Sequence, residues 1–234
     1  MTDGTADAAI GLAVLAVALT VALAVEAQPT STVAGIESDR ESLEALALKG
    51  DPARGKEAYE VCSACHLPNG SGRPDGTFPQ LAGQHARVLV KQIADIRAGR
   101  RDNPIMYPFA IMLTDPQELA DVAAYLQSLP IPPGNGKGPG IDLSEGEKLY
   151  RRDCVQCHSD RGQGNAEKFY PALAGQHYEY LLRQIRDIAA SRRRNADPDM
   201  VKVVQGYRDD QLQAVVDYVS RLSRPERAGE AGGS

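Results

Sequence analysis

Apolar side chains recur at intervals of three and four residues in two stretches of the chain, residues 84–99 and 176–191. The recurring positions are Leu89, Ile93 and Ile96 in the first stretch, and Leu181, Ile185 and Ile188 in the second. One face of an α-helix has this spacing, so both stretches are predicted to be amphipathic helices. Neither half of the chain contains a segment that is predicted to form a strand of useful length.

Shorter helices are predicted ahead of these two, over residues 53–62 and 144–154. In the second of them, Ser144 is followed three residues later by Glu147. This is the pattern of a capping box, in which the two side chains satisfy backbone N–H groups of the first turn. We therefore expect Ser144 to cap that helix.

A further helix is predicted at the end of each half of the chain. The first runs to Leu129, with Thr114 or Asp115 as its cap, and the second runs to Leu222, with Asp209 as its cap. Ala, Leu, Gly and charged residues dominate the composition, and runs of β-branched residues are few. The predicted fold class is all-α.

The predicted elements recur because the sequence itself repeats. The aligned segments are 55–66 with 146–158, 78–96 with 170–188, and 119–129 with 212–222. In the first pair the second copy contains one additional residue. Each repeat has the size of a compact small domain, so the chain is predicted to contain two domains, residues 51–129 and 142–223.

Three other segments are predicted to connect or flank these domains. Residues 130–141, "PIPPGNGKGPGI", contain too much Pro and Gly for regular structure and are predicted to be a domain linker. Residues 28–50 are predicted to be an acidic linker ahead of the first domain. Residues 224–234 are predicted to be a disordered tail.

An uncharged apolar run extends from Ala8 to Val25. The small residues before Gln28 suit cleavage of a signal peptide over residues 1–27. However, the run is nearly long enough to span a bilayer, and neither Lys nor Arg precedes it, so a retained membrane anchor is an open alternative. Both interpretations place the rest of the chain outside the cytoplasm.

The acidic excess of the chain belongs to its N-terminal extension. Residues 1–50 carry seven acidic and two basic side chains. Residues 51–129 carry nine acids and eight bases, and residues 141–222 carry thirteen of each. Because the two domains are almost neutral and have no excess of basic residues, the sequence gives no indication of nucleic-acid binding.

All four cysteines lie in two Cys-x-x-Cys-His segments at equivalent places in the repeats. A zinc site shared by the four cysteines would leave both histidines without a role. A thioredoxin-like redox pair requires a βαβ context, which the helical pattern lacks. Covalent attachment of haem uses both cysteines and the histidine together, once in each repeat.

The chain is therefore predicted to hold two covalently bound haem c groups. Their thioether bonds are assigned to Cys62, Cys65, Cys154 and Cys157, and one axial iron ligand of each haem to His66 and His158. The chain has no Trp and only three Phe, which agrees with a haem at the centre of each domain.

The repeat also selects the second axial ligand of each haem. Met200 lies twelve residues before Leu212, and Met106 lies thirteen before the equivalent Leu119, whereas Met112 lies only seven before it. Met106 and Met200 are therefore predicted to be axial ligands. Met112 is interpreted as a side chain that fills apolar space beside the haem.

Each repeat has a histidine and a proline beside an "LAGQ" segment. His85 and His177 are rival axial ligands, but they would close only short loops, and they are interpreted as surface histidines at helix starts. The carbonyl oxygens of Pro79 and Pro171 are predicted to accept the ring N–H of the axial histidines, which would fix their tautomer. The alternative for these prolines is that they only set a turn.

Two further features repeat. Gly55 and Gly146 each precede a tyrosine by one helical turn, and with Tyr125 and Tyr218 they are predicted to form a close crossing of two helices. The arginine runs at 100–101 and 192–194 are interpreted as solvated surface, with pairing to haem propionates as the alternative.

Two Cys-x-x-Cys-His segments, each followed by "LAGQ" and then by a methionine segment, resemble the dihaem cytochromes c of the cytochrome c4 family over residues 51–222. This resemblance implies two tandem class I cytochrome c domains, related by a pseudo-twofold axis, with haems close together. It also implies His/Met coordination and electron transfer in the bacterial periplasm, toward a terminal oxidase of the respiratory chain. The acidic stretch 28–50 and the apolar N-terminal segment depart from the family pattern.

With both axial positions filled, the iron has no free site for a substrate, so the chain is predicted to carry single electrons and not to be an enzyme. The expected donor is a membrane quinol-oxidising complex or a dehydrogenase, and the expected acceptor is a terminal oxidase. The alternatives are a fixed electron-accepting subunit of a dehydrogenase, as in a flavocytochrome, and a peroxidase-type haem enzyme.

Overall fold

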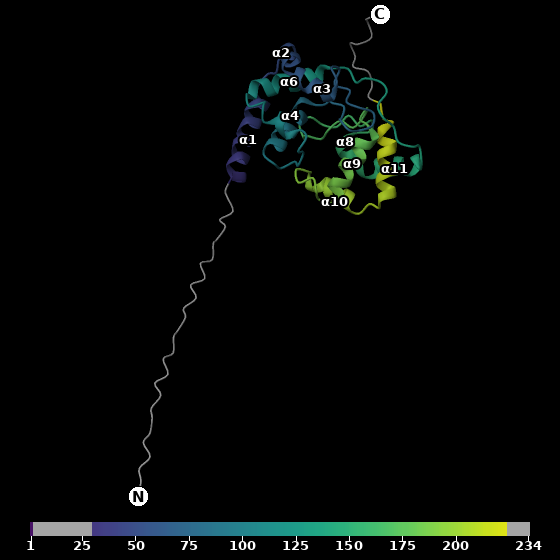
Figure 1. The fold of residues 1–234 in the computed structure, drawn as a ribbon. Coiled ribbons are helices and arrows are strands. Elements are labelled where there is room, and N and C mark those ends of the chain that lie inside the picture. Colours follow the sequence, from purple (N-terminus) through teal and green to yellow (C-terminus); the bar gives the residue numbers. More distant parts are fainter. Residues whose placement is uncertain (2–29, 224–234) are drawn as a thin grey trace, which may run out of the picture.

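The computed structural model describes Met1 and residues 30–223, with side chains in the continuous part from Asp39 onward. Regular structure in these residues is helical, apart from one isolated antiparallel bridge between Asn165 and Tyr170. The two halves of the chain form two helical domains that lie side by side (Figure 1). The all-α prediction is confirmed.

The apolar run 8–25 and the tail 224–234 lie outside the described residues. The predicted signal peptide or anchor, residues 1–27, also lies outside the described residues, apart from Met1. No helix in the described part of the chain combines the length and the apolar character that crossing a bilayer requires.

Within residues 30–223, the first half contains six helices and the second half contains five helices and a π-helix. Those of the first half are α1 (Thr30–Ala47), α2 (Pro52–Ala58), α3 (Glu60–His66), α4 (Ala86–Arg97), α5 (Tyr107–Ala110) and α6 (Pro116–Ser128). Those of the second half are α7 (Leu143–Leu149), the π-helix η1 (Tyr150–Cys154), α8 (Val155–His158), α9 (Tyr178–Ala189), α10 (Pro198–Gln205) and α11 (Asp209–Ser220).

One of the three predicted helix caps is confirmed and two are wrong. Asp115 caps α6, because its side chain accepts a backbone N–H two residues on at 2.8 Å. Helix α7 already begins before Ser144, with Asp142 at its N-cap in a left-handed conformation and without a side-chain cap. Asp209 is the first residue of α11, and its carboxylate pairs with Arg186 at 2.7 Å instead.

In each domain an early helix crosses the last helix at a glycine. A Cβ atom on Gly55 would lie 1.9 Å from the carbonyl oxygen of Asp121, and one on Gly146 would lie 2.1 Å from that of Ala214. No side chain fits at either point, so α2 approaches α6, and α7 approaches α11, at backbone distance. Ring centroids pack beside these crossings at 5.5 Å for Tyr59 with Tyr125 and 5.6 Å for Tyr150 with Tyr218. The predicted close crossing is confirmed.

The additional residue of the second repeat is accommodated in η1. Three positions separate Tyr59 from Cys62 in the first repeat, whereas four separate Tyr150 from Cys154 in the second. The second interval is the π-helix, whose wider turn takes up one residue without changing the direction of the helix on either side. The Cys-x-x-Cys-His segment can therefore keep its place in the domain despite the insertion.

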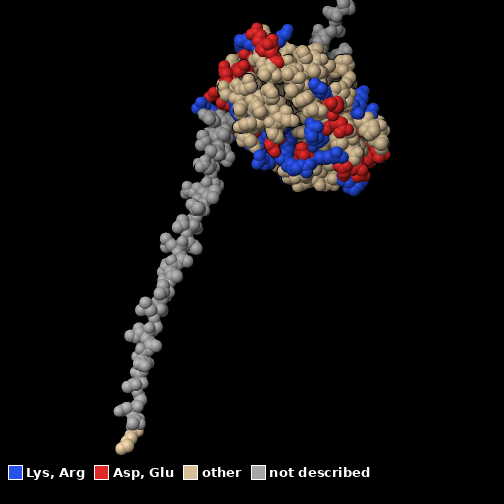
Figure 2. Space-filling model, viewed as in Figure 1, with Lys and Arg blue, Asp and Glu red and all other residues tan. Residues whose placement is uncertain are grey.

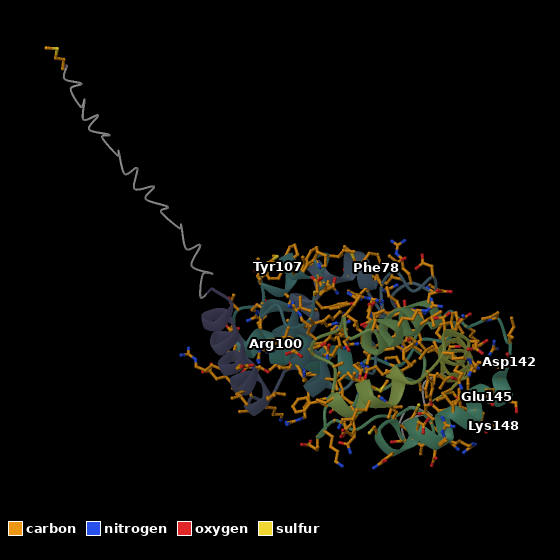
Figure 3. All side chains as sticks on the ribbon, turned by 90° about the horizontal axis from the view of Figure 1, so that it is seen from below. Phe78, Arg100, Tyr107, Asp142, Glu145 and Lys148 are labelled. Atoms are coloured by element: carbon orange, nitrogen blue, oxygen red, sulfur yellow. The ribbon has the colours of Figure 1, made fainter. Side chains whose placement is uncertain are left out.

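The segment 28–50, expected to be a linker, differs from that expectation because it contains α1. This helix packs on α4 and α6 with Ala45 buried. Its acidic residues meet basic residues at the end of α4 and just after it, since Glu41 pairs with the largely buried Arg97 and Asp39 pairs with Arg100 at 2.9 Å. Figure 3 shows Arg100 beside α1, at one end of the molecule. The acidic charge of this segment thus attaches the helix to the first domain.

The connection between the domains has no regular structure, in agreement with its Pro and Gly content. It is nevertheless fixed along the second domain. The side-chain amide of Asn135 donates to the carbonyl oxygens of Gln176 at 2.9 Å and Ser220 at 2.7 Å, and the backbone N–H of Gly140 donates to Asp217 at 2.5 Å. The connection therefore acts as part of the packed structure.

Candidate functional site

Each Cys-x-x-Cys-His segment ends a helix at its histidine. His66 is the last residue of α3 and His158 the last of α8, and their exposed fractions are 3% and 7%. All four cysteines are half-buried and form no disulfide. On a helix, residues four apart lie on one face, so the first cysteine and the histidine of each segment face the same side.

The prolines predicted to contact these histidines do so. Nδ1 of His66 lies 3.0 Å from the carbonyl oxygen of Pro79, and Nδ1 of His158 lies 3.0 Å from that of Pro171. A carbonyl oxygen only accepts, so in both rings Nδ1 carries the proton and Nε2 presents its lone pair. The contact therefore fixes the tautomer that a metal ligand requires.

Nε2 of His66 is a buried polar atom without a hydrogen-bond partner. An unsatisfied nitrogen in this position is costly unless it meets a ligand that the protein alone does not supply. Burial lowers the pKa of His66 and of His158, and the proline carbonyls only partly oppose this effect. Both rings are thus held neutral, as iron ligation demands.

The residue after each of these histidines has a strained backbone. Leu67 has a φ of 64° and Ser159 a φ of 66°, in the region that favours glycine. A buried tyrosine hydroxyl donates to the carbonyl oxygen of each, Tyr59 to Leu67 at 2.9 Å and Tyr150 to Ser159 at 2.7 Å. Sequence reasoning missed this contact, although the recurrence of the tyrosine in both repeats was its signal.

The two predicted methionine ligands lie at equivalent places in the domains. Met106 directly precedes α5 and Met200 lies in α10, and both are half-buried. Met112 is 60% exposed and does not pack among protein side chains, and its interpretation as a filler of apolar space beside the haem stays a prediction. The assignment of Met106 and Met200 as axial ligands stays a prediction.

Of the two histidines of the "LAGQ" segments, His177 is buried and His85 is half-buried, so the interpretation as surface residues is wrong for His177. His177 is only 2% exposed, and its Nε2 donates to the carbonyl oxygen of Ser71 in the first domain at 2.8 Å. Nε2 of His85 lies 2.7 Å from the carbonyl oxygen of Gln163 in the second domain. Both rings connect the domains, because each begins a helix that faces the other half.

The arginine runs also differ from the interpretation as solvated surface. Arg101 and Arg193 lie between the domains, where each donates to the side-chain oxygens of both Gln92 and Gln184 at 2.8–3.0 Å. Burial, together with the charge of Arg101, lowers the pKa of Arg193 to about 10. Two half-buried cations beside each other are compatible with an anionic group at this interface.

Other basic residues of these runs are more exposed. The guanidinium of Arg192 is exposed, and Arg194 donates from an exposed position to the carbonyl oxygen of Gly99 at 2.6 Å. Lys and Arg side chains form a band across the lower part of the face shown in Figure 2, with acidic side chains among them. The surface of the two domains is therefore mixed in charge.

The four cysteines do not gather into a single site. In the part of the chain that the structure describes, which includes all of them, no group of three or more His, Cys, Asp or Glu side chains is close enough to hold a metal. A zinc site shared by the two repeats is therefore not formed. Burial raises the pKa of Cys62 to about 11 and that of Cys154 to about 12, so these thiols are not poised as thiolate ligands.

The residues present fit a covalently held haem in each domain. Half-buried thiols and a neutral, oriented imidazole occur together twice, and the buried Nε2 of His66 lacks a partner within the protein. The sequence profile of the family described as cytochrome c matches residues 52–130 and 143–223. These two matches cover both domains.

Individual relatives agree with this match. Cytochrome c4 of Azotobacter vinelandii is 34% identical over 74% of this chain and 90% of that protein. A protein of Stutzerimonas stutzeri named thiosulfate dehydrogenase electron acceptor is 32% identical over 77% of this chain and 92% of that protein. The crystal structure of reduced recombinant cytochrome c4 from Pseudomonas stutzeri superposes with a TM-score of 0.65 at 32% identity, covering 74% of this chain and 99% of that one. The chain therefore belongs to the cytochrome c family, as an electron-transfer protein of the cytochrome c4 type with two covalently bound haem c groups.

Proposed function

We propose that this protein passes single electrons between redox proteins of the periplasm or inner membrane, with His66 and Met106 as axial ligands of one haem and His158 and Met200 as those of the other. The observation that carries this proposal is the buried, unpartnered Nε2 of His66, whose ring is oriented from its other side by Pro79. Haem c supplies a one-electron iron couple when bound in this way.

The protein side chains have two tasks in such a carrier. The proline carbonyls hold the imidazoles in one tautomer, and the thioether sulfurs of Met106 and Met200 favour the reduced state. Four protein ligands, two for each iron, would leave no coordination position for a substrate. This arrangement supports a carrier in preference to a peroxidase-type enzyme.

Exposed apolar side chains around Met106 support docking of a partner on the first domain. Ile105 is 63% exposed, Tyr107 47% and Ile111 43%, and the exposed Met112 lies next to them in sequence. The segment around Met200 instead carries the exposed ion pair of Asp199 and Lys202. Small apolar patches suit transient electron-transfer complexes, which must also dissociate.

Figure 3 shows exposed residues of the two domains that lie far from one another. Tyr107 lies on the first domain, whereas Asp142, Glu145 and Lys148 lie at the far end of the second domain. The exposed apolar side chains around Met106 and the exposed ion pair beside Met200 support different partners for the two domains. We propose that one partner donates the electron to the chain and that the other accepts it.

A terminal oxidase is the proposed acceptor, and a membrane quinol-oxidising complex or a dehydrogenase is the proposed donor. The relative named thiosulfate dehydrogenase electron acceptor favours a dehydrogenase as a second candidate donor. Purified protein would be reduced by such a dehydrogenase with thiosulfate and reoxidised by membranes that contain the oxidase. Oxidation by the membranes without reduction by the dehydrogenase would restrict the donor to the quinol pathway.

We infer that the protein works in the periplasm, with residues 1–27 acting as a signal peptide or a membrane anchor. N-terminal sequencing of the mature protein distinguishes the two. A mature chain that begins at Gln28 indicates cleavage, and a chain that retains residues 8–25 in the membrane fraction indicates an anchor.

Optical titration of the purified haem protein tests the proposed coordination. Two low-spin haems with methionine-to-iron charge-transfer absorption and no reaction with carbon monoxide are expected. Met106→Ala and Met200→Ala should each remove about half of that absorption and open one haem to carbon monoxide, while Met112→Ala should change neither. A native protein that binds carbon monoxide readily would contradict the closed carrier and favour an enzyme.

A further inference from the structure

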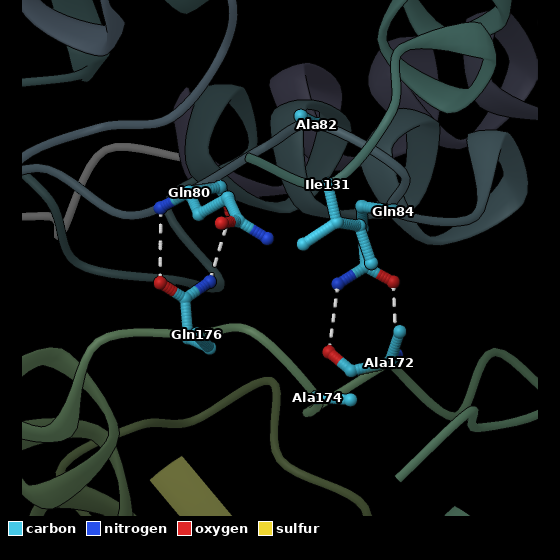
Figure 4. A pocket seen from close by; sticks show the side chains of 7 residues that line it. All are labelled: Gln80, Ala82, Gln84, Ile131, Ala172, Ala174 and Gln176. Carbon is cyan, nitrogen blue, oxygen red and sulfur yellow. Dashed lines mark hydrogen bonds between the residues drawn. The ribbon is translucent and has the colours of Figure 1, made fainter. Parts of the chain in front are cut away.

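The two domains exchange a pair of glutamine contacts at their interface. The side chain of Gln176, in the second domain, accepts the backbone N–H of Gln80 at 2.9 Å and donates to its carbonyl oxygen at 2.9 Å. The side chain of Gln84, in the first domain, accepts the backbone N–H of Ala172 at 2.9 Å and donates to its carbonyl oxygen at 3.0 Å. Figure 4 shows the two pairs side by side.

These contacts reach the peptide units that orient the axial histidines. The N–H of Gln80 belongs to the same peptide group as the carbonyl of Pro79, which accepts the ring N–H of His66. A continuous chain of hydrogen bonds therefore runs from His66, through one peptide group, to Gln176 of the other domain.

The second half of the molecule has the mirror arrangement. The N–H of Ala172 belongs to the peptide group whose carbonyl, that of Pro171, accepts the ring N–H of His158. Here the chain of hydrogen bonds ends at Gln84 of the first domain. Each axial histidine is thus connected to a glutamine of the opposite domain, and never to one of its own.

Both glutamines are held in one orientation. A backbone N–H and a backbone carbonyl meet the two ends of each amide, so exchanging its oxygen and nitrogen would break both bonds. The oxygen of Gln176 also accepts the N–H of His177 at 3.1 Å, and that of Gln84 accepts the N–H of His85 at 3.0 Å. The side-chain oxygen of each glutamine therefore stays directed at the peptide N–H of the opposite domain.

The pair of Gln80 and Gln176 lies in the interior, whereas Gln84 is half-buried. Gln80 and Gln176 are only 6% and 7% exposed. Ile131 of the linker lies between the two pairs, where a Cβ atom on Gly83 or Gly175 would come within 2.7 Å or 2.6 Å of its side chain. The cavity that remains has a volume of about 10 Å³, which is at the lower limit for one water molecule. Hydrogen bonds that follow one another in a chain of this kind polarise one another.

We propose that Gln176 and Gln84 are positioning residues that set the reduction potential of the haem in the opposite domain. An acceptor on the peptide N–H makes the peptide carbonyl more basic, and the carbonyl then draws the ring proton more strongly. The more electron-rich imidazole is a stronger donor to iron and favours the oxidised form. Each glutamine thus lowers the potential across the interface. This inference rests on the axial roles proposed for His66 and His158.

The mirror pair of variants Gln176→Leu and Gln84→Leu tests the proposal in the full-length haem protein. Potentials of the two haems are measured separately by a redox titration followed by NMR, with each haem assigned through protons of its own domain. Gln176→Leu should raise the potential of the haem held by His66, and Gln84→Leu that of the haem held by His158. The expected change is about threefold in the equilibrium constant of reduction, or about 28 mV at 59 mV per tenfold change.

Each variant is the control for the other, because both remove one interface contact of the same kind. A general loosening of the interface would shift both potentials alike in both variants, and this result would overturn the proposal, as would the absence of any shift. In the reduced protein, the Nδ1 proton resonance of His66 should move upfield in Gln176→Leu and stay in place in Gln84→Leu.

The wild-type spectrum separates this test from that of the proposed function. If the wild type shows two low-spin His/Met haems while the variants leave both potentials unchanged, only the glutamine proposal fails. If the wild type lacks such haems, the proposed coordination itself is wrong.

Discussion

Tyr150 donates its hydroxyl proton to the carbonyl oxygen of Ser159 at 2.7 Å, directly beyond the histidine that ends the second Cys-x-x-Cys-His segment. The tyrosine ring is completely buried, so no water can replace the hydroxyl. Tyr59 makes the same bond to Leu67 in the first domain at 2.9 Å. In both domains, therefore, the start of the helical segment that carries the cysteines is tied to the strained residue after the histidine.

Removal of this hydroxyl should destabilise the second domain. Tyr150→Phe leaves the carbonyl of Ser159 without its donor, at an expected cost of about 1–2 kcal/mol in the free energy of unfolding. Urea denaturation of the haem protein, followed by circular dichroism, measures this loss. Tyr125→Phe is the control, because that hydroxyl makes only an exposed contact of 3.4 Å to Pro68. Equal losses in both variants would show that the buried bond has no special role.

Glycine at position 67 should stabilise the first domain. Leu67 has a φ of 64°, which costs a residue with a Cβ atom about 1 kcal/mol relative to glycine. Leu67→Gly is therefore expected to raise the free energy of unfolding by up to about 1 kcal/mol, less the entropy that glycine gains in the unfolded chain. A lower unfolding free energy for this variant in the same urea titration would mean that packing of the leucine outweighs the strain.

The glycine crossings should not tolerate alanine. In Gly55→Ala the new methyl group would meet the Asp121 carbonyl oxygen at 1.9 Å, so α2 and α6 must separate. Overpacking of this kind costs about 1–3 kcal/mol. Gly206→Ala is the matched control, since a Cβ atom there meets nothing within 4 Å. Thermal unfolding measures both variants, and the curve of Gly206→Ala should match that of the wild type. A curve of Gly55→Ala that also matches the wild type would contradict the tight crossing.

Acid should weaken the contact between the domains at Asp95. Burial favours the neutral form of this carboxyl, but hydrogen bonds from Lys91, Asn195 and Arg100 outweigh burial and lower its pKa. The bond from Asn195, at 2.8 Å, comes from the second domain. A carboxyl with a lowered folded-state pKa stabilises the protein above its unfolded-state pKa of about 3.9, and this contribution is lost as the pH falls through the folded-state value.

The unfolding free energy should therefore decrease as the pH falls below about 4. Asp95→Asn removes the titrating group, so its stability is expected to be lower at neutral pH and to depend less on pH in the acid range. Urea titrations at a series of pH values measure both effects. Parallel pH profiles for the variant and the wild type would show that Asp95 does not contribute to the acid sensitivity.

The features that recur within one domain were predictable from the sequence. The apolar spacing gave the central helices, the repeat gave the two domains, and the Cys-x-x-Cys-His segments gave the haem attachment. The contact of His66 with Pro79 also followed from the sequence, because it depends on residues that lie close together in one repeat.

Contacts between the domains were not predictable in the same way. Polar residue types such as those of Gln84, His177 and Arg193 are common on protein surfaces. The periodicity of a helix does not tell which of its polar positions faces a second domain. The π-helix was missed for another reason. The insertion was visible in the alignment of the repeats, but whether it forms a bulge, a loop or a wider helical turn depends on packing around Tyr150.

Helix α1 shows the same limit. Its sequence is acidic and only weakly amphipathic, which is typical of a linker. It is fixed by Arg97, a residue of another helix whose burial the local pattern does not indicate.

Ile131 of the linker has a consequence for the equivalence of the two halves. Ile131 touches both "LAGQ" glycines, but with different atoms, since Cγ1 faces Gly83 and Cγ2 faces Gly175. One chiral side chain cannot offer identical surroundings to two related partners. The duplicated halves are therefore inequivalent where they approach each other.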